Sequence, residues 1–229
     1  MSSKSESGEK SPAPESASDT LCLNLSRCIH AAAQPLSILR ASLDSSHVDP
    51  MSMEELRELV ASSAAEVERL CTLFNWIQQF VHTKSIKPNL SQTPILPLLA
   101  HVADGVNLLF KEDGILLRSI VPDTCQPVLI DRARTLQALS SVLLIAHAVS
   151  HPQDTVELIA SSPSSNAVRV VVRNPASRVD VLNTEASISM AFAEANIRSQ
   201  QAGFSWSLQP FSVQMDLRGA PLEHSAESH

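Results

Sequence analysis

A histidine and a proline stand five residues apart in the segment CIHAAAQPLSIL, residues 28–39, which otherwise favours a helix. The imidazole of His30 is a candidate nucleophile. Pro35 inside a helix removes a backbone hydrogen bond and costs roughly 3 kcal/mol. Gln34 lies one helical turn after His30, where it could orient the ring or a water molecule. His30 and Gln34 are therefore the candidate catalytic residues.

Small and polar side chains share the helical face of His30. The histidine stands one residue away from an apolar row, so we expect its ring on the flank of the helix, open to solvent and to a partner. Small side chains around a single exposed isoleucine suit a docking surface. The expected partner-binding residues are Arg27, which could contact phosphoryl oxygens, and Ser37, Ile38 and Ala41.

Two long amphipathic segments must position this histidine. Apolar side chains recur at alternating spacings of four and three in both, which predicts two helices packed along a heptad seam. Ser52 and Glu55 form a capping box that starts the second helix. The seam positions are Leu25, Ile29, Ala32, Leu36, Leu39 and Leu43 in the first helix, and Leu56, Val60, Ser63, Val67, Leu70, Phe74, Ile77 and Val81 in the second.

One helical hairpin over residues 18–84 buries only half of each seam, so two hairpins are needed to close a four-helix bundle. The sequence therefore predicts a homodimer held together by this hairpin. The alternative is that the hairpin packs against the rest of its own chain.

The pattern changes after a Pro-containing linker, and residues 92–218 read as a second domain. Alternating apolar and helical segments predict an α/β sandwich with a mixed sheet, so the whole chain is of the α+β class. Helices are expected over about 94–112, 131–150 and 185–202. Strands are expected at 115–121, 127–130, 155–160 and 167–173, followed by a closing hairpin at 204–210 and 211–217.

Composition excludes several classes of protein. A net charge of −7, 3% aromatic residues and no basic run argue against nucleic-acid binding. No segment reaches the roughly 18 apolar residues of a membrane span. The four cysteines show no metal-ligand spacing, so we expect no metal site and a reduced, cytoplasmic environment. Residues 1–17 and 219–229 are expected to be disordered tails.

The order of elements and the segment ending in Gln34, Pro35 and Leu36 resemble the catalytic core of bacterial sensor histidine kinases. In that family the phosphoacceptor histidine lies five residues before a proline, which kinks the helix that presents it. The resemblance implies a dimerisation hairpin carrying the phosphoacceptor His30, followed by an ATPase domain. Two residues depart from the family pattern, because Ala31 stands where the kinases have an acidic proton acceptor and Ala33 stands where one subgroup has asparagine.

The second domain departs further at its nucleotide-binding positions. Ser141 and Ile145 occupy the two asparagine positions of the family helix, and isoleucine offers no oxygen to Mg²⁺. Asn174 replaces the adenine-binding aspartate, while Ala176 and Arg178 replace the glycines of the same box. The segment after Pro175 is too short for the ATP lid of the family. We therefore expect a kinase-like fold with a degenerate nucleotide site and no bound cofactor.

A phosphoacceptor-like histidine beside such a site resembles the bacterial histidine phosphotransferases. The implied function is ATP-independent transfer of phosphoryl groups between aspartates of response-regulator receiver domains through His30, with Mg²⁺ supplied by the receiver. The alternative is a catalytically inactive scaffold that binds a response regulator or a kinase. A third interpretation, an ATP-dependent kinase, needs the missing box residues.

Overall fold

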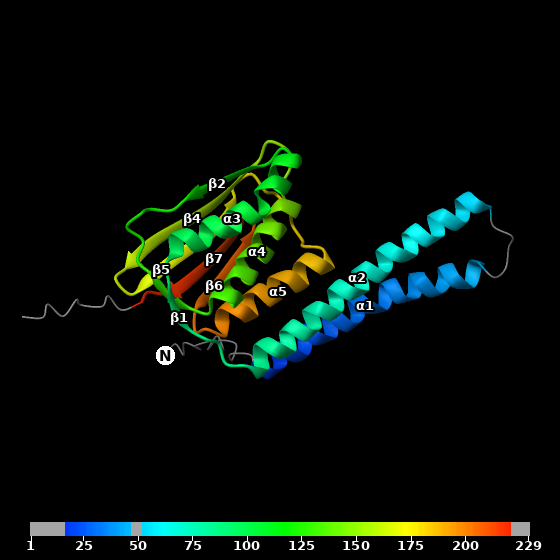
Figure 1. Ribbon diagram of the computed structural model, residues 1–229, viewed down its shortest axis with the longest axis horizontal. Coiled ribbons are helices and arrows are strands. Elements are labelled where there is room, and N and C mark those ends of the chain that lie inside the picture. Colours follow the sequence, from blue (N-terminus) through cyan, green and yellow to red (C-terminus); the bar gives the residue numbers. More distant parts are fainter. Residues whose placement is uncertain (1–16, 47–51, 221–229) are drawn as a thin grey trace, which may run out of the picture.

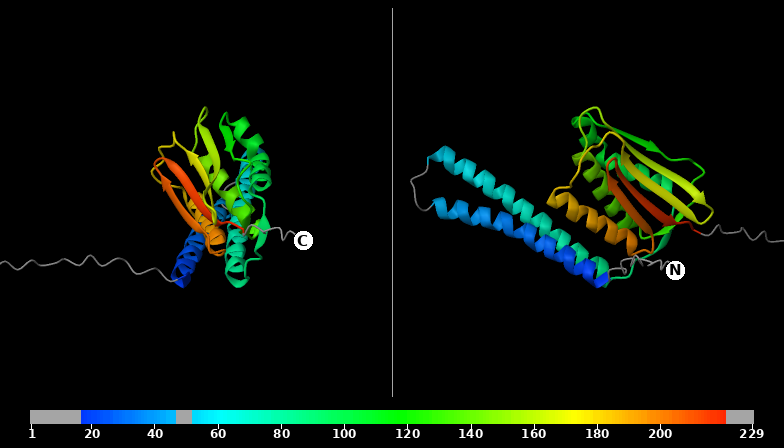
Figure 2. Two further views of the ribbon diagram at one scale, coloured as in Figure 1. Left: turned by 90° about the vertical axis from the view of Figure 1, so that its left-hand side faces the viewer. Right: turned by 180° about the vertical axis from the view of Figure 1, so that it is seen from behind.

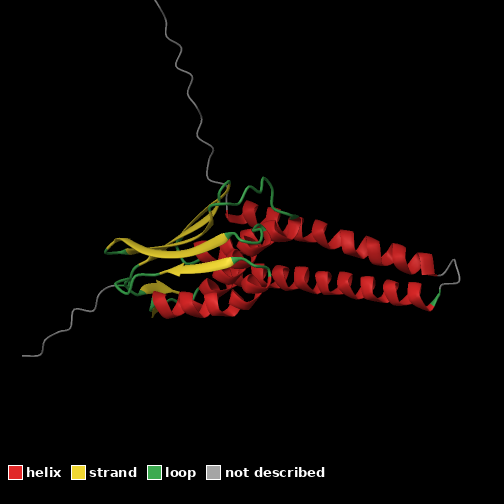
Figure 3. Cartoon of the chain, turned by 90° about the horizontal axis from the view of Figure 1, so that it is seen from above, coloured by secondary structure: helices red, strands yellow, loops and turns green. Residues whose placement is uncertain are grey.

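The structure is a computed structural model that describes residues 17–46 and 52–220 (Figure 1). Helices α1 (Ala17–Ser46) and α2 (Met53–Ser85) run side by side as a hairpin, whose loop end extends away from the rest of the molecule (Figures 1 and 3). Pro35 lies inside α1 and its side chain is buried. The two helices predicted from the seams are thus confirmed.

The capping box that starts α2 is also present. The backbone N–H of Glu55 donates to Ser52 Oγ over 3.2 Å, and the backbone N–H of Ser52 donates to Glu55 Oε2 over 2.7 Å. These bonds lower the pKa of the Glu55 carboxyl, chiefly through the backbone donor of Ser52. Two of the amides that a helix N-terminus leaves without partners are satisfied in this way.

The second domain places three helices on one face of a five-stranded sheet (Figures 1 and 2). Its sheet has the order β2-β4-β5-β7-β6, in which β2 and β4 are parallel and the other pairs are antiparallel. The elements are β1 (Ser91–Thr93), α3 (Ile95–Glu112), β2 (Leu116–Ile120), β3 (Val128–Ile130), α4 (Arg132–Ala148), β4 (Thr155–Ser164), β5 (Ala167–Asn174), α5 (Thr184–Arg198), β6 (Gly203–Leu208) and β7 (Phe211–Arg218).

Alternating buried and solvent-facing side chains along the strands form the core between the sheet and the helices. Every second side chain of β5 and β7 is buried beneath the helices, as in Val168, Val170 and Val172. The opposite face carries cross-strand ion pairs, with Arg173 Nε 2.7 Å from Glu157 Oε2 and Arg169 Nε 2.7 Å from Asp216 Oδ1. The α+β class, with helices against a mixed sheet, is therefore as expected from the sequence.

Two segments differ from the sequence-based expectation. Residues 91–93, placed at the linker, form strand β1 and pair with β3 in a separate two-stranded sheet. The sequence did not predict this strand, because three residues are too few to show a strand period. Gly219 and Ala220, assigned to the C-terminal tail, donate backbone N–H groups to Asn166 O and Pro127 O, each over 2.8 Å. The remaining residues of both expected tails, apart from Ala17, lie outside the described residues.

The hairpin packs against α5 of the second domain. Six buried side chains from three helices form one apolar cluster, namely Cys28, Ala32, Leu70, Leu73, Ile188 and Phe192. The buried row of α1 is thus Cys28, Ala32 and Pro35, whereas Ile29 and Leu36 of the expected seam are 63% and 53% exposed. Helix α5 therefore covers the face of α1 that carries Cys28, Ala32 and Pro35, and the seam positions Ile29 and Leu36 stay exposed in the single protomer.

Candidate functional site

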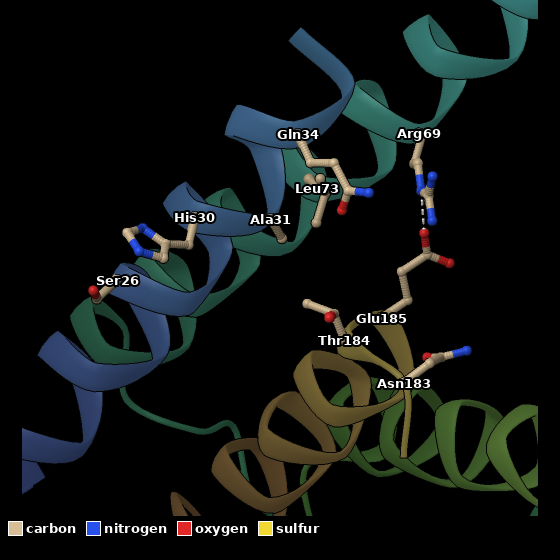
Figure 4. Close-up of a pocket in the computed structure, with 9 residues that line it drawn as sticks. All are labelled: Ser26, His30, Ala31, Gln34, Arg69, Leu73, Asn183, Thr184 and Glu185. Atoms are coloured by element: carbon tan, nitrogen blue, oxygen red, sulfur yellow. Dashed lines mark hydrogen bonds and ion pairs between the residues drawn. The ribbon is translucent and has the colours of Figure 1, made fainter. Parts of the chain in front are cut away.

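A cleft of about 400 Å³ opens beside His30, between the hairpin and the first turn of α5 (Figure 4). Its walls come from three elements that are distant in sequence. The lining residues are Ser26, His30, Ala31 and Gln34 from α1, Arg69 and Leu73 from α2, and Asn183, Thr184 and Glu185 at the start of α5.

Helix α1 contributes a polar row of Ser26, His30 and Gln34, spaced four residues apart on one helical face. All three are exposed. In the view of Figure 4 the His30 ring extends toward Ser26, whereas the Gln34 amide extends toward Arg69 and Glu185. Pro35 has no N–H, so the carbonyl of Ala31 in the cleft wall lacks its usual donor four residues on.

The His30 ring forms no hydrogen bond or ion pair within the described part of the chain. Ala31, in the position where the family has an acidic residue, places only a methyl group beside it. The imidazole therefore keeps its nitrogen lone pair available to an incoming electrophile but has no general base attached. This arrangement suits attack on an activated phosphoryl group and does not suit deprotonation-assisted attack on a poorer one.

The opposite wall is the N-terminal turn of α5, which Asn183 caps. The backbone N–H of Ala186 donates to Asn183 Oδ1 over 2.8 Å, so this turn is locally ordered by its own sequence. Thr184 and Glu185 follow the cap and line the cleft.

An ion pair joins the two walls. Arg69 Nε donates to Glu185 Oε1 over 2.5 Å, and Glu66 Oε2 lies 3.7 Å from Arg69 on the preceding turn of α2. The carboxylate of Glu185, followed by that of Glu66, raises the pKa of the Arg69 guanidinium. The cation of the cleft is therefore held between two acidic groups.

The remaining predicted partner-binding residues continue along α1. Ser37, Ile38 and Ala41 are exposed beyond Gln34, and Ser37 Oγ donates to Ala33 O over 2.8 Å. The side chain of Arg27 lies outside the described residues. Sequence reasoning missed Arg69, Asn183 and Glu185, because no local pattern links them to His30.

Asn174, expected at the adenine position, is hydrogen-bonded within the protein. Asn174 is fully buried, and its Nδ2 donates to Ser150 Oγ over 2.7 Å and to Asp154 Oδ2 over 2.9 Å. Its Oδ1 accepts the backbone N–H of Ala176 over 2.9 Å. The donor atoms of Asn174 are thus fully used by two neighbouring acceptors, which leaves none for a purine.

Asp154 is held ionised by this network. The backbone N–H of His151 lowers the pKa of the Asp154 carboxyl, and the amide of Asn174 lowers it further. An aspartate at position 174 would face this negative charge, so asparagine is the residue that fits.

The other residues expected at the nucleotide site differ in their exposure. Ile145 is buried in the domain core and Ser141 is half-buried, whereas Ala176 and Arg178 are exposed. Over the described residues, no group of three or more histidine, cysteine or acidic side chains could hold a metal ion. Nor is any described helix long and apolar enough to cross a membrane.

No protein-family model and no curated protein matches the sequence. Among solved structures, histidine kinase AdeS of Acinetobacter baumannii matches with a TM-score of 0.63 at 16% identity, over 83% of this chain and 97% of that chain. The chain has the fold of a histidine kinase core.

Two further structures support this assignment of the histidine kinase fold. Histidine kinase ThkA, in complex with response regulator protein TrrA, gives a TM-score of 0.65 at 14% identity, over 89% of this chain and 63% of that chain. Full-length ShkA in complex with AMPPNP gives 0.60 at 18% identity, over 89% of this chain and 46% of that chain. At these identities the likeness concerns the fold.

Proposed function

We propose that the protein is an ATP-independent histidine phosphotransferase that relays phosphoryl groups between receiver-domain aspartates through His30. The observation that carries the proposal is the contrast between two sites in one chain. The ring of His30 borders an open cleft and has its nitrogens available. The position that should hold adenine is occupied by a buried asparagine whose hydrogen bonds are all internal.

The reaction needs no nucleotide, because the receiver supplies both the phosphoryl group and the Mg²⁺. The lone pair of His30 Nε2 forms an N–P bond while the P–O bond to the receiver aspartate breaks, and the aspartate carboxylate leaves with the bonding electrons. The proton on Nδ1 stays on the ring during this step. The Mg²⁺ of the receiver neutralises the phosphoryl oxygens, and the same step in reverse phosphorylates a second receiver.

The absence of an acidic residue after His30 is compatible with attack on an aspartyl phosphate. An acyl phosphate has a good leaving group, so its attacker needs less help from a base than an attacker of ATP does. Gln34, on the next turn of the same face, extends into the cleft, where it orients a water molecule or the incoming phosphoryl group. A related fold, ThkA, has been described with a response regulator. We therefore expect receiver domains as partners and the cytoplasm as the place of action.

The exposed apolar row of the hairpin supports a homodimer as the working form. Val60, Val67, Phe74 and Val81 recur every seven residues on α2 and are 48–60% exposed, and Ile29 and Leu36 repeat this spacing on α1. Other seam positions pack within the protomer, namely Ala32, Leu39, Leu70 and Ile77, whereas Leu56 in the first turn of α2 is 43% exposed. One stripe of each seam is thus left for a second copy, as a four-helix bundle requires.

Label transfer tests the function directly. Receivers phosphorylated on aspartate are mixed with wild type, His30→Gln, Gln34→Ala and the control His101→Gln, which alters an exposed histidine on α3. Wild type and the control should gain acid-labile, base-stable label from at least one receiver. His30→Gln should gain none while it remains folded, and Gln34→Ala should gain it more slowly. Label that persists in His30→Gln, or no transfer from any receiver of the organism, would favour the scaffold function instead.

A further inference from the structure

We propose that Arg69 and Glu185 are positioning residues for phosphotransfer, because their ion pair holds the first turn of α5 against the hairpin as the second wall of the His30 cleft. This inference rests on the proposed function. It gives the ATPase-like domain a role in the transfer site that involves no nucleotide.

The ion pair lies on the same stripe as the apolar contact between hairpin and domain. On α5, Glu185, Ile188 and Phe192 follow spacings of three and four, which places them on one helical face. Ile188 and Phe192 are buried against Cys28, Ala32, Leu70 and Leu73 of the hairpin. The pair thus extends this interface by one turn, to the end at which the cleft opens.

The other end of the interface is tied through the linker. Arg134 at the start of α4 donates from Nη2 to the carbonyl of Ile86 over 2.6 Å and from Nη1 to Ser199 Oγ over 3.0 Å. Asp131 Oδ2 accepts the backbone N–H of Asn89 over 2.9 Å. The linker and the C-terminal end of α5 are therefore held together, and Arg69–Glu185 is the polar tie at the N-terminal end.

Charge balance gives the pair a second effect on the site. A phosphoryl group entering the cleft is an anion, and Glu185 without its partner would present an unneutralised carboxylate to it. Arg69 offsets that charge and is itself held by Glu66. The guanidinium is engaged by these carboxylates, so its role is to hold the wall and its charge in place.

A charge swap separates this role from direct contact with the phosphoryl group. The variants are Arg69→Glu, Glu185→Arg and the double exchange, with Arg57→Glu as control, since Arg57 lies 12 residues or about 18 Å earlier on α2 and pairs with Glu54. An exposed ion pair contributes up to about 1 kcal/mol, which is about fivefold in rate, and reversal adds repulsion from Glu66 and Glu185. We expect Arg69→Glu to slow label transfer about fivefold or more.

The double exchange should recover more than half of the lost rate, because the attraction between positions 69 and 185 is rebuilt with opposite polarity, while the repulsion between Glu66 and the glutamate introduced at position 69 remains. Hydrogen exchange supplies the structural readout. The amides of Ala186 and Ser187 in the first turn of α5 should exchange faster in Arg69→Glu and recover in the double exchange. The control should match wild type in both assays.

Three results would overturn the proposal. One is wild-type transfer by Arg69→Glu with its thermal midpoint preserved. Another is a double exchange as slow as Arg69→Glu, which would assign Arg69 to direct phosphoryl contact. The third is unchanged amide exchange in the first turn. If Arg69→Glu fails to fold, Arg69→Gln replaces it and should show a smaller slowing without the added repulsion. Absence of label on wild type itself refutes the proposed function instead, and the exchange arm still tests the tie.

Discussion

Restoring the aspartate of the kinase family at position 174 should destabilise this protein and should not restore nucleotide binding. Asn174→Asp keeps the acceptor for the amide of Ala176 but loses both Nδ2 donors. Ser150 cannot compensate at no cost, since its hydroxyl already donates to Ala146 O over 2.6 Å. The new carboxylate would also face Asp154 inside the domain.

The magnitude follows from these contacts. Each buried hydrogen bond that loses a partner costs about 1–3 kcal/mol, and the bond to the charged Asp154 lies at the upper end, so we expect a loss of about 4 kcal/mol. For a chain of this size that lowers the thermal midpoint by about 10 °C. The electrostatic part of this loss should shrink as pH falls from neutral and should be gone at about pH 4, the usual carboxyl pKa in the unfolded chain, because burial beside Asp154 raises the folded-state pKa of the introduced carboxyl and the penalty belongs to its charged form.

Denaturant unfolding at several pH values measures this loss, with Asn174→Asp/Asp154→Asn as the matched control. The control exchanges donor and acceptor, so it should recover more than half of the lost stability. Calorimetry with Mg²⁺ and ATP should show no binding to wild type or to Asn174→Asp. A variant as stable as wild type, or one that binds nucleotide with micromolar affinity, would refute the account of Asn174.

Three further predictions concern the hairpin. Phe74→Glu should convert the proposed homodimer to a folded monomer, because Phe74 is 56% exposed in the protomer and lies on the row proposed to contact the second copy, whereas Asn75→Glu on the same turn should leave the dimer intact. Leu70→Glu should instead unfold the protomer, since Leu70 is buried within it. Light scattering measures loss of the dimer and circular dichroism measures unfolding. A wild-type monomer at micromolar concentration would contradict the prediction for Phe74→Glu. Ser52→Ala should cost about 1 kcal/mol of stability by removing the cap of α2, with Ser62→Ala in mid-helix as control; equal midpoints for the two variants would argue against a stabilising cap.

The elements of this fold were predictable where their signal is local. The capping box of Ser52 and Glu55 marks the start of α2 in sequence, and alternation of buried valines marks β5. Heptad spacing predicted both long helices but not which neighbour covers each side of α1, such as the side of Cys28 and Ala32. That side depends on α5, which lies about 160 residues further along the chain, and no period within α1 encodes which neighbour will cover it.

The candidate site was predictable only on α1. The exposed positions of His30 and Gln34 follow from helical geometry, because each lies one residue from the apolar rows. Arg69 and Glu185 are separated by 116 residues, and their pairing is a consequence of how the domain docks on the hairpin. The substitution at Asn174 was visible in sequence as a loss, but its hydrogen-bond partners Ser150 and Asp154 were not.

The packing of α5 against the hairpin gives the second domain a structural role that needs no bound nucleotide. Removing the domain would expose Cys28, Ala32 and Leu73 on the hairpin, which are 0%, 8% and 1% exposed in its presence. The hairpin that carries His30 is therefore stabilised by the domain independently of any nucleotide. Burial raises the pKa of the Cys28 thiol, as expected for an apolar position. Neither Ile145 nor Asn174 belongs to the cluster between α5 and the hairpin, so this contact does not depend on the residues at the expected nucleotide positions.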